Sequence, residues 1–315
     1  RARFVLSAGH GSMLLYSLLH LTGYDVSMDD LKSFRQWGSR TPGHPEHGLT
    51  PGVEVTTGPL GQGFAHGVGL ALAAKHAAAR LAGAEFNPIG ARVWGIVSDG
   101  DLMEGVAAEA ASIAGHLQLG NLVYLYDSNK ITIDGSTDLA FTEDVAKRFE
   151  SYGWWVTHVD GHDHEQVAAA LQAAKDQGAK PALIVARTVI GKGAPTKENT
   201  SKVHGAPLGA DEMAKTRAAA GWTHEPFHVP AHVRDVFRAA AAKGTAARQS
   251  WEAELATWKE KHPARAAEYA ALFEHALPND LEAQLLAATG TTPDATRSLG
   301  GKAINAAGKA FPALL

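Results

Sequence analysis

Cysteine is absent from the 315 residues of this chain, so the chain can form neither a disulfide bond nor a thiol nucleophile. Long apolar runs are absent too: none approaches the ~20 residues that a helix needs to cross a bilayer. Basic residues are not in excess, since 29 Lys and Arg stand against 33 Asp and Glu. A net charge of -4 argues against a nucleic-acid partner, because such partners favour a basic surface.

What is present is the composition of an ordinary globular protein, with 45% hydrophobic and 20% charged residues. The length is enough for one large domain with a packed core and further elements. The chain opens on Arg1 rather than Met and carries no signal-peptide pattern. We therefore expect it to be a fragment of a longer protein.

The most informative stretch is a strand–helix–strand unit near the middle of the first half. An apolar run at residues 93–97 ends in Ser98 and Asp99, and residues 104–116 then repeat small apolar residues with helical spacing. A second apolar run, at residues 122–126, ends in Asp127 and Asn129. Both polar ends are expected at the carboxyl edge of a parallel sheet, where open α/β sheets bind ligands.

The residues at this edge are hard oxygen ligands. Asp99 offers a carboxylate, Asn129 an amide oxygen, and the loop around Ile131 backbone carbonyls. Mg²⁺ and Ca²⁺ prefer such ligands, and a single formal charge leaves positions for phosphate oxygens. Gly100 lets a diphosphate approach the backbone closely. The sequence therefore predicts a phosphorylated cofactor that is bound with its own metal ion.

The rest of the first two hundred residues alternates helical and strand patterns. This predicts an α/β fold: a doubly wound parallel sheet with helices on both faces. A loop rich in Gly, Pro and Thr at residues 38–63 is long enough to be functional. Helices are expected at 11–21, 29–37, 64–81, 143–152 (capped by Thr142), 165–175 and 250–261, strands at 154–159 and 182–186, and a connector at 278–294.

Several segments resemble the transketolase family and follow that family's order. Asp99-Gly100, with Asn129 thirty residues after the Asp, resembles the family's thiamine diphosphate motif. That motif usually opens with Gly, so Ser98 is a mild departure. The other matching segments are Leu6-Ser7-Ala8-Gly9-His10-Gly11-Ser12, Thr41-Pro42-Gly43-His44-Pro45-Glu46, Thr57-Gly58-Pro59-Leu60-Gly61-Gln62-Gly63, Ile131-Thr132-Ile133-Asp134-Gly135 and Val203-His204-Gly205-Ala206-Pro207-Leu208-Gly209.

The resemblance implies a set of binding residues in this chain. Thiamine diphosphate would be bound through Mg²⁺, for which Ca²⁺ can substitute. By the matching motifs, Asp99, Asn129 and the Ile131 carbonyl would ligate the metal. The implied cofactor contacts are His10, Gly58, Pro59, Leu60, Gly100, Asn129 and His204.

The resemblance also implies an activity. The family transfers a two-carbon ketol unit from a ketose phosphate such as xylulose 5-phosphate to an aldose phosphate such as ribose 5-phosphate, as in the pentose phosphate pathway and Calvin-type sugar rearrangements. His44 and His204 would line the route to the substrate, and Glu104 would lie near a homodimer interface beside the family's cofactor-activating glutamate. We expect a cytoplasmic enzyme that has no membrane partner.

The same resemblance predicts three regions. Residues 1–209 would bind the diphosphate and metal, 210–296 would form a helical linker region, and 297–315 would begin the pyrimidine-binding domain. The activating glutamate and the sugar-phosphate grip would lie in that domain of the other subunit. We therefore expect the chain alone to be inactive.

Other interpretations stay open at this point. Another thiamine diphosphate enzyme, such as a dihydroxyacetone synthase or a deoxyxylulose phosphate synthase, shares the metal motif, and a non-catalytic assembly fragment would keep the dimer surface. Asp99 and Asn129 on their own suit strand-end turns, and Glu104 suits a solvated first helical turn. The His- and Asp-rich segment 158–164 has zinc-ligand residue types but fits a turn better. Thr132 lies where a calcium loop needs glycine, and the spacing after Gly61 does not fit a dinucleotide fingerprint.

Overall fold

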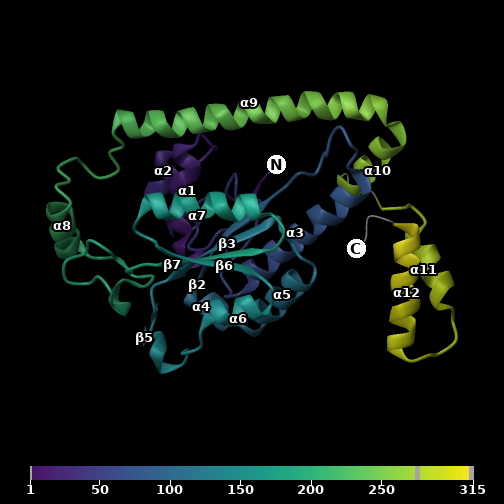
Figure 1. Ribbon diagram of the computed structural model, residues 1–315, viewed down its shortest axis with the longest axis horizontal. Helices are drawn as coiled ribbons and strands as arrows, with labels where there is room; N and C mark the ends of the chain where they lie inside the picture. The colour runs from purple at the N-terminus through teal and green to yellow at the C-terminus, as the bar shows by residue number, and fades with distance from the viewer. Residues whose placement is uncertain (1, 274–276, 312–315) are drawn as a thin grey trace. The chain divides into compact units, whose positions relative to one another are not determined.

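Five parallel strands form the central sheet, in the order β1-β2-β3-β7-β6 (Figure 1). The computed structural model describes residues 2–273 and 277–311. Each strand is short and apolar, and β2 pairs with β3 so that Val97 is opposite Tyr126. All carboxyl ends therefore meet at one edge. The strands are β1 (Arg3–Leu6), β2 (Val93–Ser98), β3 (Leu122–Ser128), β6 (Trp155–Asp160) and β7 (Ala182–Arg187).

Helices cover both faces of this sheet (Figure 1). Because side chains alternate along a strand, Tyr124 and Tyr126 of β3 face one side while Val123 faces the other. The first side packs against α3 (Gln62–Leu81), α5 (Gly105–His116) and α6 (Val145–Ser151), and the second against α1 (Ser12–Leu21) and α7 (His164–Gln177). The expected doubly wound α/β fold is confirmed.

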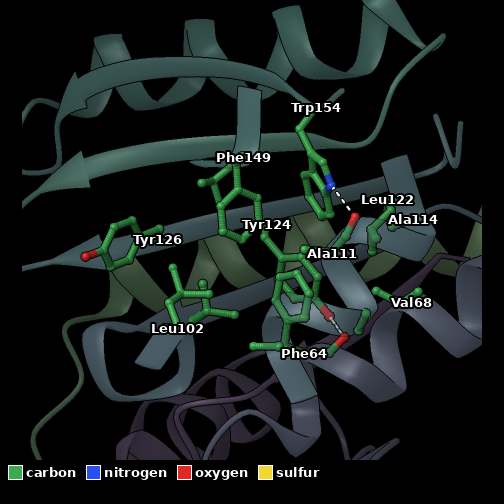
Figure 2. Packing of buried hydrophobic residues seen from close by; sticks show 14 of the residues in the cluster. Phe64, Val68, Leu102, Ala111, Ala114, Leu122, Tyr124, Tyr126, Phe149 and Trp154 are labelled. Atoms are coloured by element: carbon green, nitrogen blue, oxygen red, sulfur yellow. Dashed lines mark hydrogen bonds between the residues drawn. The ribbon is translucent and has the colours of Figure 1, made fainter. Parts of the chain in front are cut away.

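A cluster of aromatic rings fills the core between β3 and its helices (Figure 2). The Phe64 ring stacks on Tyr124 with centroids 4.6 Å apart, and Phe149 meets Trp154 edge-on at 5.1 Å. The polar ends of these rings are satisfied: Tyr124 donates to the Phe64 carbonyl at 2.7 Å and Trp154 to the Ala111 carbonyl at 2.9 Å. The cluster fixes α3, α5 and α6 against the sheet.

The described chain divides into two compact units, the first comprising residues up to 75 together with 90–248. Besides the sheet and its helices, this unit holds the short helices α2 (Met28–Lys32) and α4 (Asp99–Met103). It also holds α8 (Ala210–Ala219) and the two-stranded hairpin of β4 (Ile131–Thr132) and β5 (Gly135–Ser136).

The second unit comprises residues 76–89 and the chain from 249 onward. Its core is formed by Leu81, Leu255 and Trp258, and Arg80 pairs with Glu268 at 2.5 Å. Its helices are the end of α3, the end of α9 (Ala231–Lys261), α10 (Pro263–Phe273), α11 (Leu281–Thr289) and α12 (Thr296–Ala310). Within the described residues, no helix is both long and apolar enough to cross a membrane.

Four sequence expectations are wrong in detail. Asp144, rather than Thr142, caps α6, since its carboxylate accepts from the Lys147 N–H at 3.1 Å. The helix expected at 29–37 ends at Lys32, and the connector expected at 278–294 contains α11. The buried Leu255 and Trp258 also make the 250–261 segment less solvated than expected. Residues 312–315 of the third expected region lie outside the described residues.

Candidate functional site

Asp99 is the first residue after β2 and lies at the carboxyl edge of the sheet, as predicted. Only 3% of it is exposed. Its Oδ1 accepts a hydrogen bond from the Tyr126 hydroxyl at 2.5 Å, and its Oδ2 accepts from the Lys130 N–H at 3.0 Å. Neighbouring strand ends therefore fix the position of this carboxylate.

Burial shapes the ionisation of this pair. Desolvation raises the pKa of Asp99, although hydrogen bonds from Tyr126 and Lys130 oppose the rise. Burial also raises the pKa of Tyr126, so its hydroxyl stays protonated and donates. In the described part of the chain no Lys or Arg side chain pairs with Asp99. A buried carboxylate without a counter-charge is costly, and a bound cation would remove that cost.

Asn129 lies beside Asp99 on the loop that leaves β3, and 7% of it is exposed. Its Oδ1 accepts from the Ile131 N–H at 2.9 Å, and the second lone pair of this oxygen remains for a ligand. Its Nδ2 donates to Asp127 at 3.3 Å, and Asp127 also accepts from the Thr188 hydroxyl. The sheet edge thus brings the three predicted metal ligands into one loop region. Their chemistry, one carboxylate, one amide and one carbonyl, suits Mg²⁺ or Ca²⁺.

Asp101 organises the same edge, and the sequence analysis missed it. This residue is fully buried. Its Oδ1 accepts from the Ser7 hydroxyl at 2.7 Å and the Gly61 N–H at 2.9 Å, and its Oδ2 accepts from the Ser98 N–H at 2.9 Å. Ser7 in turn accepts from the Phe64 N–H at 3.0 Å. The spacing Ser98-x-x-Asp101, typical of a capping box, was the available signal.

His10 and His204 meet although they are far apart in sequence. Their rings stack with centroids 4.8 Å apart. Burial and the nearby His204 lower the pKa of His10, and burial lowers the pKa of His204. Both rings are therefore neutral at pH 7, and each can donate one hydrogen bond and accept another. Nδ1 of His204 is buried without a partner among the described residues.

Hydrogen bonds hold the loop that carries His204 on both sides of that residue. Glu212 of α8, 4% exposed, accepts from the Thr196 N–H at 2.7 Å and the Thr196 hydroxyl at 2.5 Å. These bonds lower the pKa of Glu212. The Lys197 ammonium donates to the Leu208 carbonyl at 2.7 Å. These contacts lie before and after His204 in the sequence, so they hold residues 196–212 in place and position His204 next to His10.

The glycine-rich loop brings further predicted residues to the same place. A Cβ built on Gly58 would lie 3.3 Å from the His44 ring, and one built on Gly100 would lie 3.0 Å from a Leu60 methyl. His44 is exposed and close enough to lower the pKa of His10 electrostatically. Leu60 is 37% exposed, and Pro59 is exposed beside it. These residues leave an apolar surface next to the Asp99 edge.

Glu104, the third predicted catalytic residue, lies against Gly61 of the same loop. The side chain is exposed at the junction of α4 and α5. A Cβ built on Gly61 would come within 2.7 Å of the Glu104 Cβ.

A pocket of about 660 Å³ opens from Asp99, along Lys130, His158 and Arg187. The histidines at 10, 44 and 204 do not line that pocket.

The arrangement fits thiamine diphosphate and a divalent ion on three observations. Asp99 is buried without a counter-charge among the described residues. A Cβ on Gly100 would come within 3.0 Å of a Leu60 methyl, so a bare glycine keeps the backbone close to the Leu60 surface. His204 holds a buried ring nitrogen that needs a partner.

Comparison with known proteins agrees with this arrangement. Residues 1–278 match the family model "Transketolase, thiamine diphosphate binding domain". A transketolase of Geobacillus stearothermophilus is 54% identical over 317 residues, which cover 100% of this chain and 48% of that protein. A transketolase structure from Leishmania mexicana matches 99% of this chain and 47% of its own, with 45% identity and a TM-score of 0.92.

A transketolase of Pichia stipitis, solved in complex with sedoheptulose 7-phosphate, is 44% identical, with a TM-score of 0.92. The match covers 99% of this chain and 47% of the Pichia stipitis chain. The chain thus spans about half the length of the relatives it matches. A family match over most of the chain, and identities near one half, leave one conclusion. The chain belongs to the transketolase family, and residues 1–278 match its thiamine diphosphate binding domain.

Proposed function

We propose that the protein carrying this chain is a transketolase, which transfers a two-carbon ketol unit from a ketose phosphate to an aldose phosphate. The observation that supports this most strongly is the meeting of His10, His204 and the Gly58 loop beside the buried Asp99. Relatives named transketolase support it as well, one of them solved with a ketose phosphate, sedoheptulose 7-phosphate. Xylulose 5-phosphate as donor and ribose 5-phosphate as acceptor are the proposed substrates.

In this proposal the edge of the sheet holds the cofactor and its metal. Asp99, Asn129 and the Ile131 carbonyl ligate Mg²⁺, and Gly100 and the two stacked histidines lie against the diphosphate. Gly58, Pro59 and Leu60 supply an apolar support for the flat aminopyrimidine. When bound, thiamine diphosphate supplies the chemistry that breaks and forms the carbon–carbon bonds, and the protein orients it.

The histidines provide hydrogen bonds along the route to the substrate. Because burial lowers the pKa of His10 and His204, neutral rings can donate to a sugar hydroxyl or to a developing oxyanion without a fixed charge. His44 is exposed, and its ring lies against Gly58. We assign it to substrate positioning.

The complete enzyme is proposed to be a cytoplasmic homodimer of the pentose phosphate pathway, with its active site between subunits. Glu104 is exposed at the start of α5 and would lie near the interface, beside the partner's activating glutamate. We also propose the division into residues 1–209, 210–296 and 297–315 as the diphosphate domain, the linker region and the start of the next domain.

Calorimetric titration of thiamine diphosphate into the full-length protein tests this proposal. Saturable binding that needs Mg²⁺, and that Ca²⁺ also supports, is the expected result. Binding of equal strength in EDTA would contradict the metal assignment. No binding at any metal concentration would contradict the cofactor assignment.

A further inference from the structure

Arg35 has a backbone conformation that residues with a side chain rarely adopt. Its φ of 61° lies in the left-handed region, where the Cβ of a non-glycine residue crowds the backbone. The Arg35 N–H donates to the Thr41 carbonyl at 3.0 Å, so a hydrogen bond closes the turn that imposes this conformation. Backbone strain of this kind persists where the surrounding structure determines it, and it is concentrated at functional sites.

The strained turn places the Arg35 guanidinium against Gly43, the residue directly before His44. A Cβ built on Gly43 would lie 3.0 Å from the Arg35 Nε and 3.2 Å from its Cζ, so the bare glycine leaves room for the guanidinium. We assign His44 to substrate positioning. The guanidinium therefore lies beside the proposed route to the substrate.

Hydrogen bonds from buried side chains fix the chain around Gly43. The Ser12 hydroxyl donates to the Gly43 carbonyl at 2.8 Å, and the Tyr16 hydroxyl donates to the Pro42 carbonyl at 2.9 Å. Ser12 and Tyr16 are both fully buried on α1. Burial raises the pKa of Tyr16 to about 12, so its hydroxyl stays protonated and donates. The surface on which the Arg35 guanidinium lies is therefore held in one position.

Arg35 has no acidic partner among the residues that the structure describes, although a second arginine of the same loop has two. Arg40 pairs with Asp25 at 3.2 Å and with Asp30 at 3.8 Å. The Arg35 side chain is exposed, and its guanidinium keeps its donors for a ligand. The planar fork of a guanidinium fits two oxygens of a phosphate group, and both proposed substrates carry a phosphate.

We propose that Arg35 is a substrate-binding residue whose guanidinium contacts the phosphate group of the sugar phosphate. The inference rests on the proposed function, because the phosphate belongs to the proposed substrates. It goes further by assigning part of the preference for phosphorylated sugars to this chain, whereas the family resemblance places the sugar-phosphate grip in the other subunit. Arg35 donates hydrogen bonds to phosphate oxygens and takes no part in making or breaking covalent bonds.

The experiment measures ketol transfer by the full-length protein from xylulose 5-phosphate, at one saturating concentration, to either ribose 5-phosphate or ribose. Arg35→Gln should lower kcat/KM for ribose 5-phosphate by about 10-fold, because a hydrogen bond to a charged group is lost. It should leave kcat/KM for ribose nearly unchanged, because ribose carries no phosphate. Arg35→Lys should give an intermediate loss, since lysine keeps the charge but not the planar fork.

Two further variants separate substrate binding from a role in the fold. Arg40→Gln removes the arginine of the same loop that has acidic partners, so it should keep the wild-type ratio of the two kcat/KM values. Arg35→Gly should not lower the melting temperature, because glycine adopts a positive φ without strain. It should nevertheless lose the preference for ribose 5-phosphate as Arg35→Gln does.

A loss that is confined to ribose 5-phosphate in both Arg35→Gln and Arg35→Gly supports the inference. An equal loss with the two acceptors, or the same change of ratio in Arg40→Gln, would overturn it and leave the proposed function intact. Absence of any transfer by the wild-type protein would contradict both the inference and the proposed function.

Discussion

At the residue scale, the proposed binding of the cofactor and its metal depends most on Asp99. Its carboxylate is buried and has no counter-charge among the described residues. Asp99→Ala should therefore abolish cofactor binding by the full-length protein even in excess Mg²⁺. Titration calorimetry measures this, with Asp134→Ala, an exposed change on the nearby hairpin, as the control. Unchanged affinity in Asp99→Ala would refute the ligand assignment.

The stacked histidines predict a pH dependence of stability. Because burial lowers the pKa of His10 and His204 in the folded chain, the unfolded chain binds protons first as pH falls. The free energy of unfolding should therefore decrease as pH falls below about 6.5, the ordinary histidine pKa, and continue to decrease to the lowered pKa values.

His10→Gln with His204→Gln should make this decline shallower, and urea unfolding between pH 7.5 and 5 measures the slope. The exposed His116→Gln is the control for removal of a histidine. An identical slope in the double variant and the wild type would contradict neutral burial of the pair.

At the residue scale, the site residues that belong to a local sequence motif could be predicted. The site residues whose roles depend on contacts between distant segments could not. Asp99 and Asn129 could be placed because strand ends are visible as apolar runs followed by polar residues. The hydrogen bond from Tyr126 to Asp99 depends on the register between β2 and β3, and no local sequence pattern reveals that register. Asp101 was missed because its partners Ser7 and Gly61 come from distant segments.

At the scale of elements, the start of α3 is set by its contact with the end of β1. A Cβ on Gly63 would lie 2.5 Å from the Ser7 Cα, a backbone atom that cannot move aside cheaply. Gly63→Ala should therefore destabilise the chain by about 1–3 kcal/mol. It should also weaken cofactor binding, because Ser7 holds Asp101 at the site edge.

Gly69→Ala in the same helix is the matched control, since nothing lies within 4 Å of a Cβ there. This change should stabilise the chain by about 0.5–1 kcal/mol, because alanine favours helix interiors. Urea unfolding measures both variants. Equal effects of the two changes would mean that the Ser7 contact does not constrain α3.

Element types could largely be predicted, because strong periodicity marks α3, α5 and α7 and short apolar runs mark β2, β3 and β7. Boundaries could not always be predicted. Both Thr142 and Asp144 are good caps, and only the fold selects Asp144. The α11 sequence has turn residues on both sides that made it resemble a connector.

At the scale of the whole molecule, Glu104 tests the proposed dimer. Two carboxylates that share a hydrogen bond across an interface cannot both stay ionised cheaply. Glu104→Gln in the full-length protein should therefore weaken dimerisation or cofactor binding more than it lowers the melting temperature. Glu109→Gln, also exposed on α5, is the control. Analytical ultracentrifugation, calorimetric titration of the cofactor and thermal unfolding separate these effects. Equal dimerisation and equal cofactor binding in the two variants would contradict the interface role.

The measurement that tests the central claim most directly is ketol transfer from xylulose 5-phosphate to ribose 5-phosphate, with thiamine diphosphate and Mg²⁺ present. It is run on the full-length protein and on the 315-residue chain. The chain spans about half the length of its relatives, and the proposed active site takes residues from a second subunit. We predict turnover by the full-length protein and none by the chain alone. No transfer by the full-length protein, loaded with cofactor and metal, would contradict the assignment as a transketolase.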